Sequence, residues 1–307
     1  MNVFSTLAPV FLIVALGVAL RRTNFLSAEF FSGANRLVYW VGLPVLLFSR
    51  LWRAESLQDG WTAFLLALAG MAACLAAALV AAAFLRLPGP KKGAFLQGSF
   101  RANLAYVGLA VVSFAFPEPE AERASTLAII VLAGLAPIYN VVAVVVLLAG
   151  RHRLEAKALA RMGRSIVTNP IIIACVAGIG MSLSGVAAPV AVERTLGAVG
   201  RFALPIALLC IGGAIASTPI RSRAFPAFLA ATIKVGVGPA VGVGLAWLIG
   251  AGPTETRVAA IMLACPAAVA SYVLADQLGG DGPMAAGIVV ASTILSAAAL
   301  SLVVWLV

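Results

Sequence analysis

The sequence predicts an all-α polytopic membrane protein with ten transmembrane helices. Of its 307 residues, 63% are hydrophobic and only 10% are Asp, Glu, Lys or Arg, whereas a soluble domain carries about 25% charged residues. The mean hydropathy is +1.08, and roughly ten apolar runs of about twenty residues can be separated, each long enough to cross a bilayer. These properties exclude a soluble enzyme, a secreted disulfide scaffold and a disordered regulator. The runs are continuously apolar instead of alternating, which also excludes a β-barrel.

The spans follow from apolar runs that are bounded by charge, Pro and Gly. They are expected near residues 3–20, 34–51, 61–85, 93–115, 124–149, 165–184, 195–216, 224–250, 256–275 and 284–306. The first run resembles a signal peptide, but its positive charge, at Arg21 and Arg22, follows the apolar stretch instead of preceding it. We therefore expect it to be the first span.

The distribution of basic residues predicts the orientation. Of the 21 Lys and Arg residues, twelve lie in alternate loops, around 21–22, 86–92, 151–164 and 221–223, and five lie in the loops of the opposite side. Since cytoplasmic loops retain Lys and Arg, both termini are expected on the non-cytoplasmic side of the inner (plasma) membrane. The net charge of +10 is then a topology signal, and no nucleic-acid partner is expected.

The four cysteines give no sign of a metal or redox site. Cys74, Cys175, Cys210 and Cys265 lie inside apolar stretches without CxxC spacing, so we interpret them as small hydrophobic residues. We expect neither a metal nor an organic cofactor.

The chain divides into two halves with five spans each. Residues 1–150 and 165–307 form the halves, and residues 151–164 form a cytoplasmic linker. An odd number of spans per half requires that any structural repeat be inverted across the membrane. Leu43-Pro44 in the second span is echoed by Leu204-Pro205 in the seventh, and Tyr106-Val107 by Tyr272-Val273 at an offset of 166. Inverted repeats are typical of secondary transporters.

Two spans carry the features of interrupted helices. The fourth has a polar cluster between Gly98 and Gly108, and the ninth contains Pro266, which removes a backbone donor. Transporters bind substrate at the midplane between such helices, where half-helix amino ends suit an anion. The candidate substrate-binding or crossover residues are Asn103, Tyr106, Gly108, Pro266, Ser271 and Tyr272. The alternative is that Pro and Gly here only kink helices or ease packing.

Charged residues at depth form a second set of candidates, for electrostatic or coupling roles. Lys234 lies about ten residues inside the eighth span and should face a cavity or a partner, unless it snorkels to the interface. Arg101 has the same two interpretations. Asp276, at the inner end of the ninth span, is the nearest protonatable coupling candidate, although a solvated helix end also explains it.

Other polar residues in or near the spans are interpreted structurally. Asn35 and Asn140 are candidates for hydrogen bonds between helices, and Arg36 and Arg201 for interfacial anchors. The one histidine, His152, lies among loop cations, so a histidine proton relay is not expected.

Several motifs together resemble the auxin efflux carrier family, whose bacterial members are commonly labelled malonate or other dicarboxylate permeases. They are the run from Phe100 to Gly108, Asn35 followed by Leu43-Pro44, the Thr168-Asn169-Pro170 opening of the sixth span, and the Gly-rich eighth and ninth spans with Pro266. The resemblance covers nearly the whole chain. Many members have Pro soon after the Gly equivalent to Gly108, and this chain has none there.

The resemblance implies a fold similar to bile-acid symporters and sodium/proton antiporters. Spans 1, 2, 6 and 7 would form a scaffold, and spans 3–5 and 8–10 a mobile transport domain. Spans 4 and 9 would unwind and cross at the substrate site, with Asn103 and Pro266 as crossover residues. Relatives also suggest a homodimer, and the linker of roughly fifteen residues leaves little room for regulation by phosphorylation.

The sequence therefore predicts a secondary transporter that moves a small organic anion, a malonate- or auxin-like carboxylate, across the lipid bilayer by elevator-type alternating access. The coupling ion would be H⁺ or Na⁺. The alternatives are a carboxylate-sensing membrane protein or a passive channel on the same fold. An intramembrane enzyme is not expected, because paired membrane aspartates and a Ser/His pair at comparable depth are missing, and no phosphate-binding loop for ATP occurs.

Overall fold

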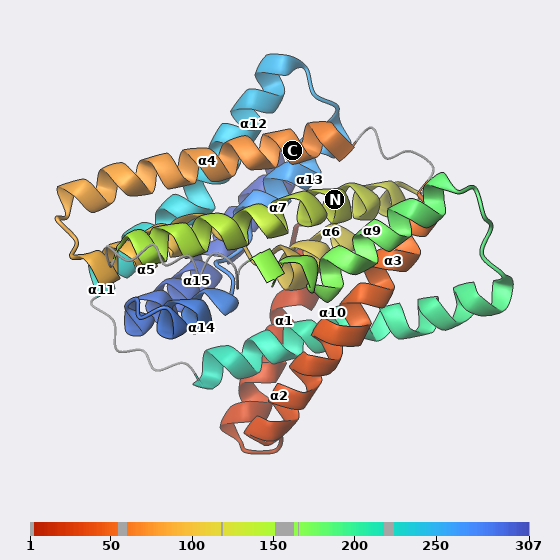
Figure 1. Cartoon of the computed structure of the whole chain (residues 1–307), viewed down its shortest axis with the longest axis horizontal. Helices are drawn as coiled ribbons and strands as arrows, with labels where there is room; N and C mark the ends of the chain where they lie inside the picture. The colour runs from red at the N-terminus through yellow and green to blue at the C-terminus, as the bar shows by residue number, and fades with distance from the viewer. Residues whose placement is uncertain are drawn as a thin grey trace.

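The computed structural model of the chain is an assembly of helices (Figure 1). It describes residues 3–54, 60–117, 119–150, 163–164, 166–217 and 224–306, with the side chains of 3–6 and 224 left out. Within this part no strand forms, and one isolated antiparallel bridge joins Ala102 to Ala267. The predicted all-α class is confirmed.

The α-helices and three short π-helical turns (η) occur in the following order. They are α1 (Val3–Arg22), α2 (Ala28–Leu37), η1 (Val38–Gly42), α3 (Leu43–Trp52), α4 (Gly60–Phe84), α5 (Gly89–Phe100), η2 (Leu104–Gly108), α6 (Leu109–Ala115), α7 (Glu120–Ala149), α9 (Pro170–Leu183), α10 (Val190–Ser217), α11 (Ala224–Thr232), η3 (Ile233–Val237), α12 (Gly238–Ile249), α13 (Pro253–Ala264), α14 (Ala270–Gln277) and α15 (Gly282–Leu306).

Several of these helices are long enough to cross a membrane. In the described part of the chain six are sufficiently long and apolar, namely Ala28–Trp52, Gly60–Phe84, Glu120–Ala149, Val190–Ser217, Phe225–Ile249 and Gly282–Leu306. The remaining predicted spans correspond to α1, to α9, and to two helices that are interrupted, α5 with η2 and α6, and α13 with α14. The protein is thus a polytopic membrane protein.

Two of the long helices contain a π-helical turn directly before a proline. The turn η1 precedes Leu43-Pro44, and η3 precedes Gly238-Pro239. A proline inside a helix leaves the carbonyl four residues earlier without its donor and clashes with it. A π-helical turn widens the backbone at that point and relieves the clash without ending the helix. Both helices therefore continue through their prolines.

The helices form two groups (Figure 1). In one group α1 packs along α10, and α3 packs against α9 and α10. In the other, α4 packs against α7 and α12, α5 against α7, and α11 against α15. Figure 1 shows α1, α2, α3 and α10 gathered on one side of the molecule and α4 and α12 on the other. The interrupted helices belong to the second group, and α6 also reaches α1 in the first.

Glycines bring α1 and α10 into backbone contact. A Cβ atom added to Gly17 would overlap the carbonyl oxygen of Leu209, and one added to Gly212 would overlap the carbonyl oxygen of Val14. Lipid gives no hydrophobic driving force between helices, so close packing through small residues has to hold them together.

We therefore expect Gly212→Ala to lower the free energy of unfolding by about 1–3 kcal/mol, because the added methyl must displace the main chain of α1. The matched control is Gly244→Ala in α12, where no described atom lies within 4 Å of the added Cβ. Thermal unfolding in detergent measures both. Equal midpoints for the two variants would contradict the close packing of α1 on α10.

Candidate functional site

The two interrupted helices cross each other at their breaks. After α5 ends at Phe100, the backbone turns extended at Arg101, and after α13 ends at Ala264 it turns extended at Cys265. The N–H of Asn103 donates to the Pro266 carbonyl at 2.8 Å, and the N–H of Ala268 donates to the Arg101 carbonyl at 2.9 Å. The two breaks therefore pair as a minimal antiparallel ladder, joined at Ala102 and Ala267.

This pairing replaces hydrogen bonds that the breaks remove. In a continuous helix the N–H of Asn103 would donate to Ser99, and that of Ala268 to Ala264. Each donor instead finds a carbonyl of the opposite chain segment. The interrupted backbone is thereby satisfied without water, which a membrane interior requires.

A further broken pair is satisfied by side chains from two other helices. In a continuous helix the N–H of Ala267 would donate to the carbonyl of Leu263. Here that N–H donates to Ser292 Oγ of α15 at 2.9 Å, and Lys234 Nζ of η3 donates to the Leu263 carbonyl at 2.6 Å. Lys234 is 1% exposed, so it does not snorkel to the interface. Its ammonium group lies at the carboxyl end of α13, where the helix dipole favours a cation.

A cation also lies at the other break. Arg101 Nη2 donates to Asn140 Oδ1 of α7 at 2.7 Å, which is a bond between helices. Its Nη1 is buried and has no partner among the described residues. Arg101 therefore stays at the break and does not extend toward Lys91 and Lys92 at the start of α5.

Other buried polar atoms near the break also lack partners. In the described part of the chain these include Gln97 Oε1, Tyr139 Oη and Ser271 Oγ, together with Nη1 of Arg101. Gln97 Nε2 lies 3.4 Å from the Ser271 carbonyl, and the rings of Tyr139 and Phe100 stand 6.0 Å apart. Buried polar groups are almost always hydrogen-bonded. A polar ligand at the crossover would supply the missing partners.

The remaining predicted residues fall into three places. Asn103 is buried beside the crossover, and a side chain at Gly108 would collide with Met262 of α13. Tyr106 donates to Asn35 Oδ1 of α2 at 2.8 Å.

The third place is in α14, after the second break. Tyr272 and Asp276 flank Gly282 at the start of α15, each within 4 Å of where its Cβ would be, and Asp276 is exposed.

The structure also brings in residues that the sequence interpretation left out. Gln97, Tyr139 and Ser292 contribute polar atoms to the crossover region. Their only signal in the sequence is a polar side chain within an apolar run. Arg201, expected to be an interfacial anchor, lines a cavity beside α3. No group of three or more His, Cys, Asp or Glu residues suited to a metal occurs among the described residues.

Paired helix breaks with polar groups at their crossing, inside an apolar helical assembly, are features of membrane transport proteins. The sequence matches the membrane transport protein family over residues 2–306. The chain belongs to this family, the auxin efflux carriers, as its motifs indicated. It is a family of transporters and not of enzymes. No curated protein shows significant similarity to the chain.

The bond from Ala267 to Ser292 can be tested directly. We expect Ser292→Ala to lower the free energy of unfolding by about 1–3 kcal/mol, because the buried N–H of Ala267 loses its acceptor. The control is Ser296→Ala, one turn further along α15, whose hydroxyl bonds only to the carbonyl of Thr293 in its own helix. Thermal unfolding in detergent compares them. A midpoint for Ser292→Ala no lower than that of the control would show that this bond does not hold the break.

Proposed function

We propose that the protein is a secondary active transporter of a small organic anion, a malonate- or auxin-like carboxylate. The observation that carries the proposal is the crossing of the two helix breaks, with unpartnered buried polar atoms on Arg101 and Ser271 beside it. A site of this composition is costly in a membrane protein unless a ligand uses it.

The charge near the crossing favours an anion. Arg101 and Lys234 lie at the two breaks, whereas residues 93–116 and 258–275, which contain both breaks, include no Asp or Glu. The amino ends of η2 and α14 add further N–H donors that suit a carboxylate. In this proposal Asn103, Ser271 and the half-helix amides hold the carboxylate, and Arg101 sets the local field.

The packing supports an inverted repeat of ten spans and elevator-type alternating access. The pairing of α1 with α10 relates the first and seventh spans, and that of α3 with α9 relates the second and sixth. A repeat of five spans would match the first span with the sixth and the second with the seventh. It would therefore turn the one packed pair into the other. We propose that these helices form the scaffold and that α4–α7 and α11–α15 move against it. The hydrogen bond from Tyr106 to Asn35 crosses this boundary.

The basic loops support an orientation with both termini outside and residues 151–164 in the cytoplasm, in the inner (plasma) membrane. We propose H⁺ or Na⁺ as the coupling ion. We also propose a homodimer, which the resemblance to the family implies.

Transport of malonate by proteoliposomes tests this function. We expect saturable counterflow by the wild-type protein, dependent on an imposed pH or sodium gradient. Asn103→Ala and Pro266→Ala should each reduce the rate at least tenfold. The first removes a side-chain amide that is proposed to hold the carboxylate, and the second restores an N–H that favours a continuous helix at the break. Gln277→Ala, which removes an exposed amide at the end of α14, is the matched control.

Wild-type flux in both crossover variants would refute the assignment of the site. Flux without counterflow would indicate a channel, and folded protein that moves none of a panel of mono- and dicarboxylates would indicate a sensor or a different substrate.

A further inference from the structure

A cavity of about 790 Å³ lies among α1, α3, α6 and α10. It is lined by four arginines, Arg50, Arg53, Arg194 and Arg201, against a single acidic residue, Glu193. The lining therefore has an excess of three positive charges. So many charged residues in one lining are unusual for a chain in which only 10% of all residues are charged.

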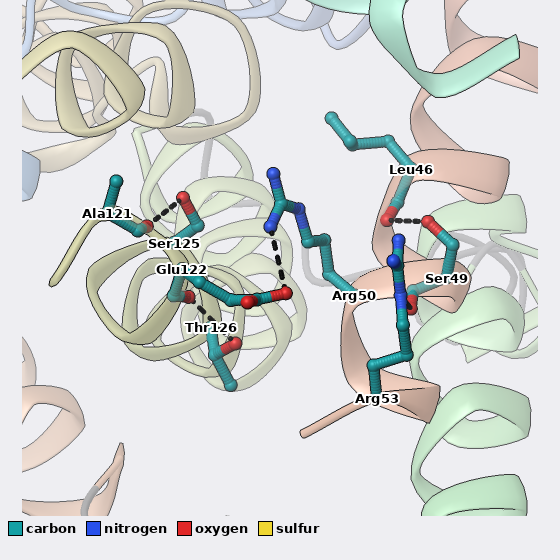
Figure 2. Close-up of polar contacts among 8 residues, drawn as sticks. All are labelled: Leu46, Ser49, Arg50, Arg53, Ala121, Glu122, Ser125 and Thr126. Atoms are coloured by element: carbon teal, nitrogen blue, oxygen red, sulfur yellow. Dashed lines mark hydrogen bonds and ion pairs between the residues drawn. The ribbon is translucent and has the colours of Figure 1, made fainter. Parts of the chain in front are cut away.

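The guanidinium groups of this cavity are only partly used within the protein. Arg50 Nη1 lies 3.4 Å from Glu122 Oε1 of α7, and Arg53 Nε donates to the Ser49 carbonyl at 3.3 Å (Figure 2). Arg194 and Arg201 make no hydrogen bond or ion pair with any other residue in the described ranges. Most of the N–H donors in the cavity therefore remain free for a ligand.

The cavity extends along α10 from Glu193 to Leu208. Arg201 and Pro205 lie well inside this 28-residue helix and yet are exposed, because they border the cavity, and the buried Leu208 lies deeper. An arginine at this position would be costly in lipid, so a water-filled cavity explains how it is tolerated.

The cavity is connected to the crossing of the helix breaks by one helix. Ser113 and Phe114 of α6 line it, and the helical segment that carries them begins directly after Asn103. Ten residues of helix separate Asn103 from Ser113, which corresponds to about 15 Å along the axis. The cavity and the crossover are thus about 15 Å apart along one helix.

Topology makes the arginines harder to explain as anchors. Arg50, Arg53 and Arg194 are three of the five basic residues that fall in loops of the predicted non-cytoplasmic side. Lys and Arg are retained on the cytoplasmic side, so non-cytoplasmic loops are expected to contain few of them. Their concentration around one cavity therefore requires another reason.

We propose that this cavity binds a dicarboxylate on its way between the crossover and the non-cytoplasmic solution. The proposal rests on the transport function above. It adds a second binding site, separate from the crossover, and a substrate with two negative charges. The planar guanidinium fork binds a carboxylate through two parallel hydrogen bonds. A dianion would engage the free Arg194 and Arg201 at one end and displace Glu122 from Arg50 at the other. Glu122 is a substitute anion that keeps Arg50 paired when the cavity is empty.

Thiol labelling in the cavity tests the proposal. The native cysteines in the described chain are all buried, so Ser113→Cys, an exposed cavity position, supplies a single reactive thiol. The full-length protein in phosphatidylcholine nanodiscs is treated with an anionic methanethiosulfonate reagent, with and without malonate or acetate.

We expect malonate to slow the labelling of this thiol at concentrations at least tenfold lower than acetate. Combining Arg194→Gln with Arg201→Gln should weaken the malonate effect about tenfold or more. Glu122→Gln should strengthen it about threefold, since no anion then competes for Arg50. Arg22→Gln, which removes one positive charge at the end of α1 that is predicted to be cytoplasmic, should leave it unchanged.

Equal malonate protection in the arginine variants and in the Arg22→Gln control would overturn the proposal. Protection by nanodiscs containing phosphatidylglycerol but not by malonate would also overturn it, and would assign the cavity to a lipid headgroup. Measuring protection and malonate transport in the same Ser113→Cys protein, with Asn103 intact, separates the two proposals. Malonate protection without any malonate transport supports the cavity and refutes the function. Normal malonate transport without protection supports the function and refutes the cavity.

Discussion

The structure depends on one constraint, which is that a helix cannot be interrupted inside a bilayer unless its freed backbone groups find partners. Each of the two breaks frees several N–H and carbonyl groups, and neither break could satisfy them alone. By crossing, the segments around Ala102 and Ala267 donate to each other. The pairing explains why the chain carries two breaks and why they lie against each other.

The crossing also requires side chains from helices that are not interrupted. Ser292 of α15 accepts a hydrogen bond from the N–H of Ala267, and Lys234 of η3 donates one to the carbonyl of Leu263. In a continuous helix these two backbone groups would have bonded to each other. The lysine is buried for an electrostatic reason as well as for hydrogen bonding, since it meets the negative end of a half-helix. Arg101 is held in a similar way by Asn140 of α7. The break is therefore fixed by residues from several helices.

The local part of this arrangement could be predicted from the sequence. Pro266 predicted the second break because a missing N–H is a local property, and the Gly-bounded polar run from Gly98 to Gly108 predicted the first. Both helices are interrupted there, even without a proline after Gly108. The prediction failed where the partner is distant in sequence. Nothing in the run around Lys234 indicates that its ammonium group reaches Leu263. Nothing in the sequence around Arg201 indicates that it lines a cavity together with residues of α3. The functional roles of the crossover residues remain predictions.

The guanidinium of Arg101 has a consequence for the energetics of a moving transport domain. Arginine does not lose its proton in a protein, so under the proposed elevator the empty binding unit carries a fixed positive charge through the field of the membrane. One elementary charge gains about 2.3 kcal/mol for each 100 mV it crosses. A cell interior that is electrically negative would pull the empty unit inward, whereas a dianion balances the charges of Arg101 and Lys234 in the loaded one. Voltage alone then turns the cycle toward export, and import of the same anion would require an accompanying cation.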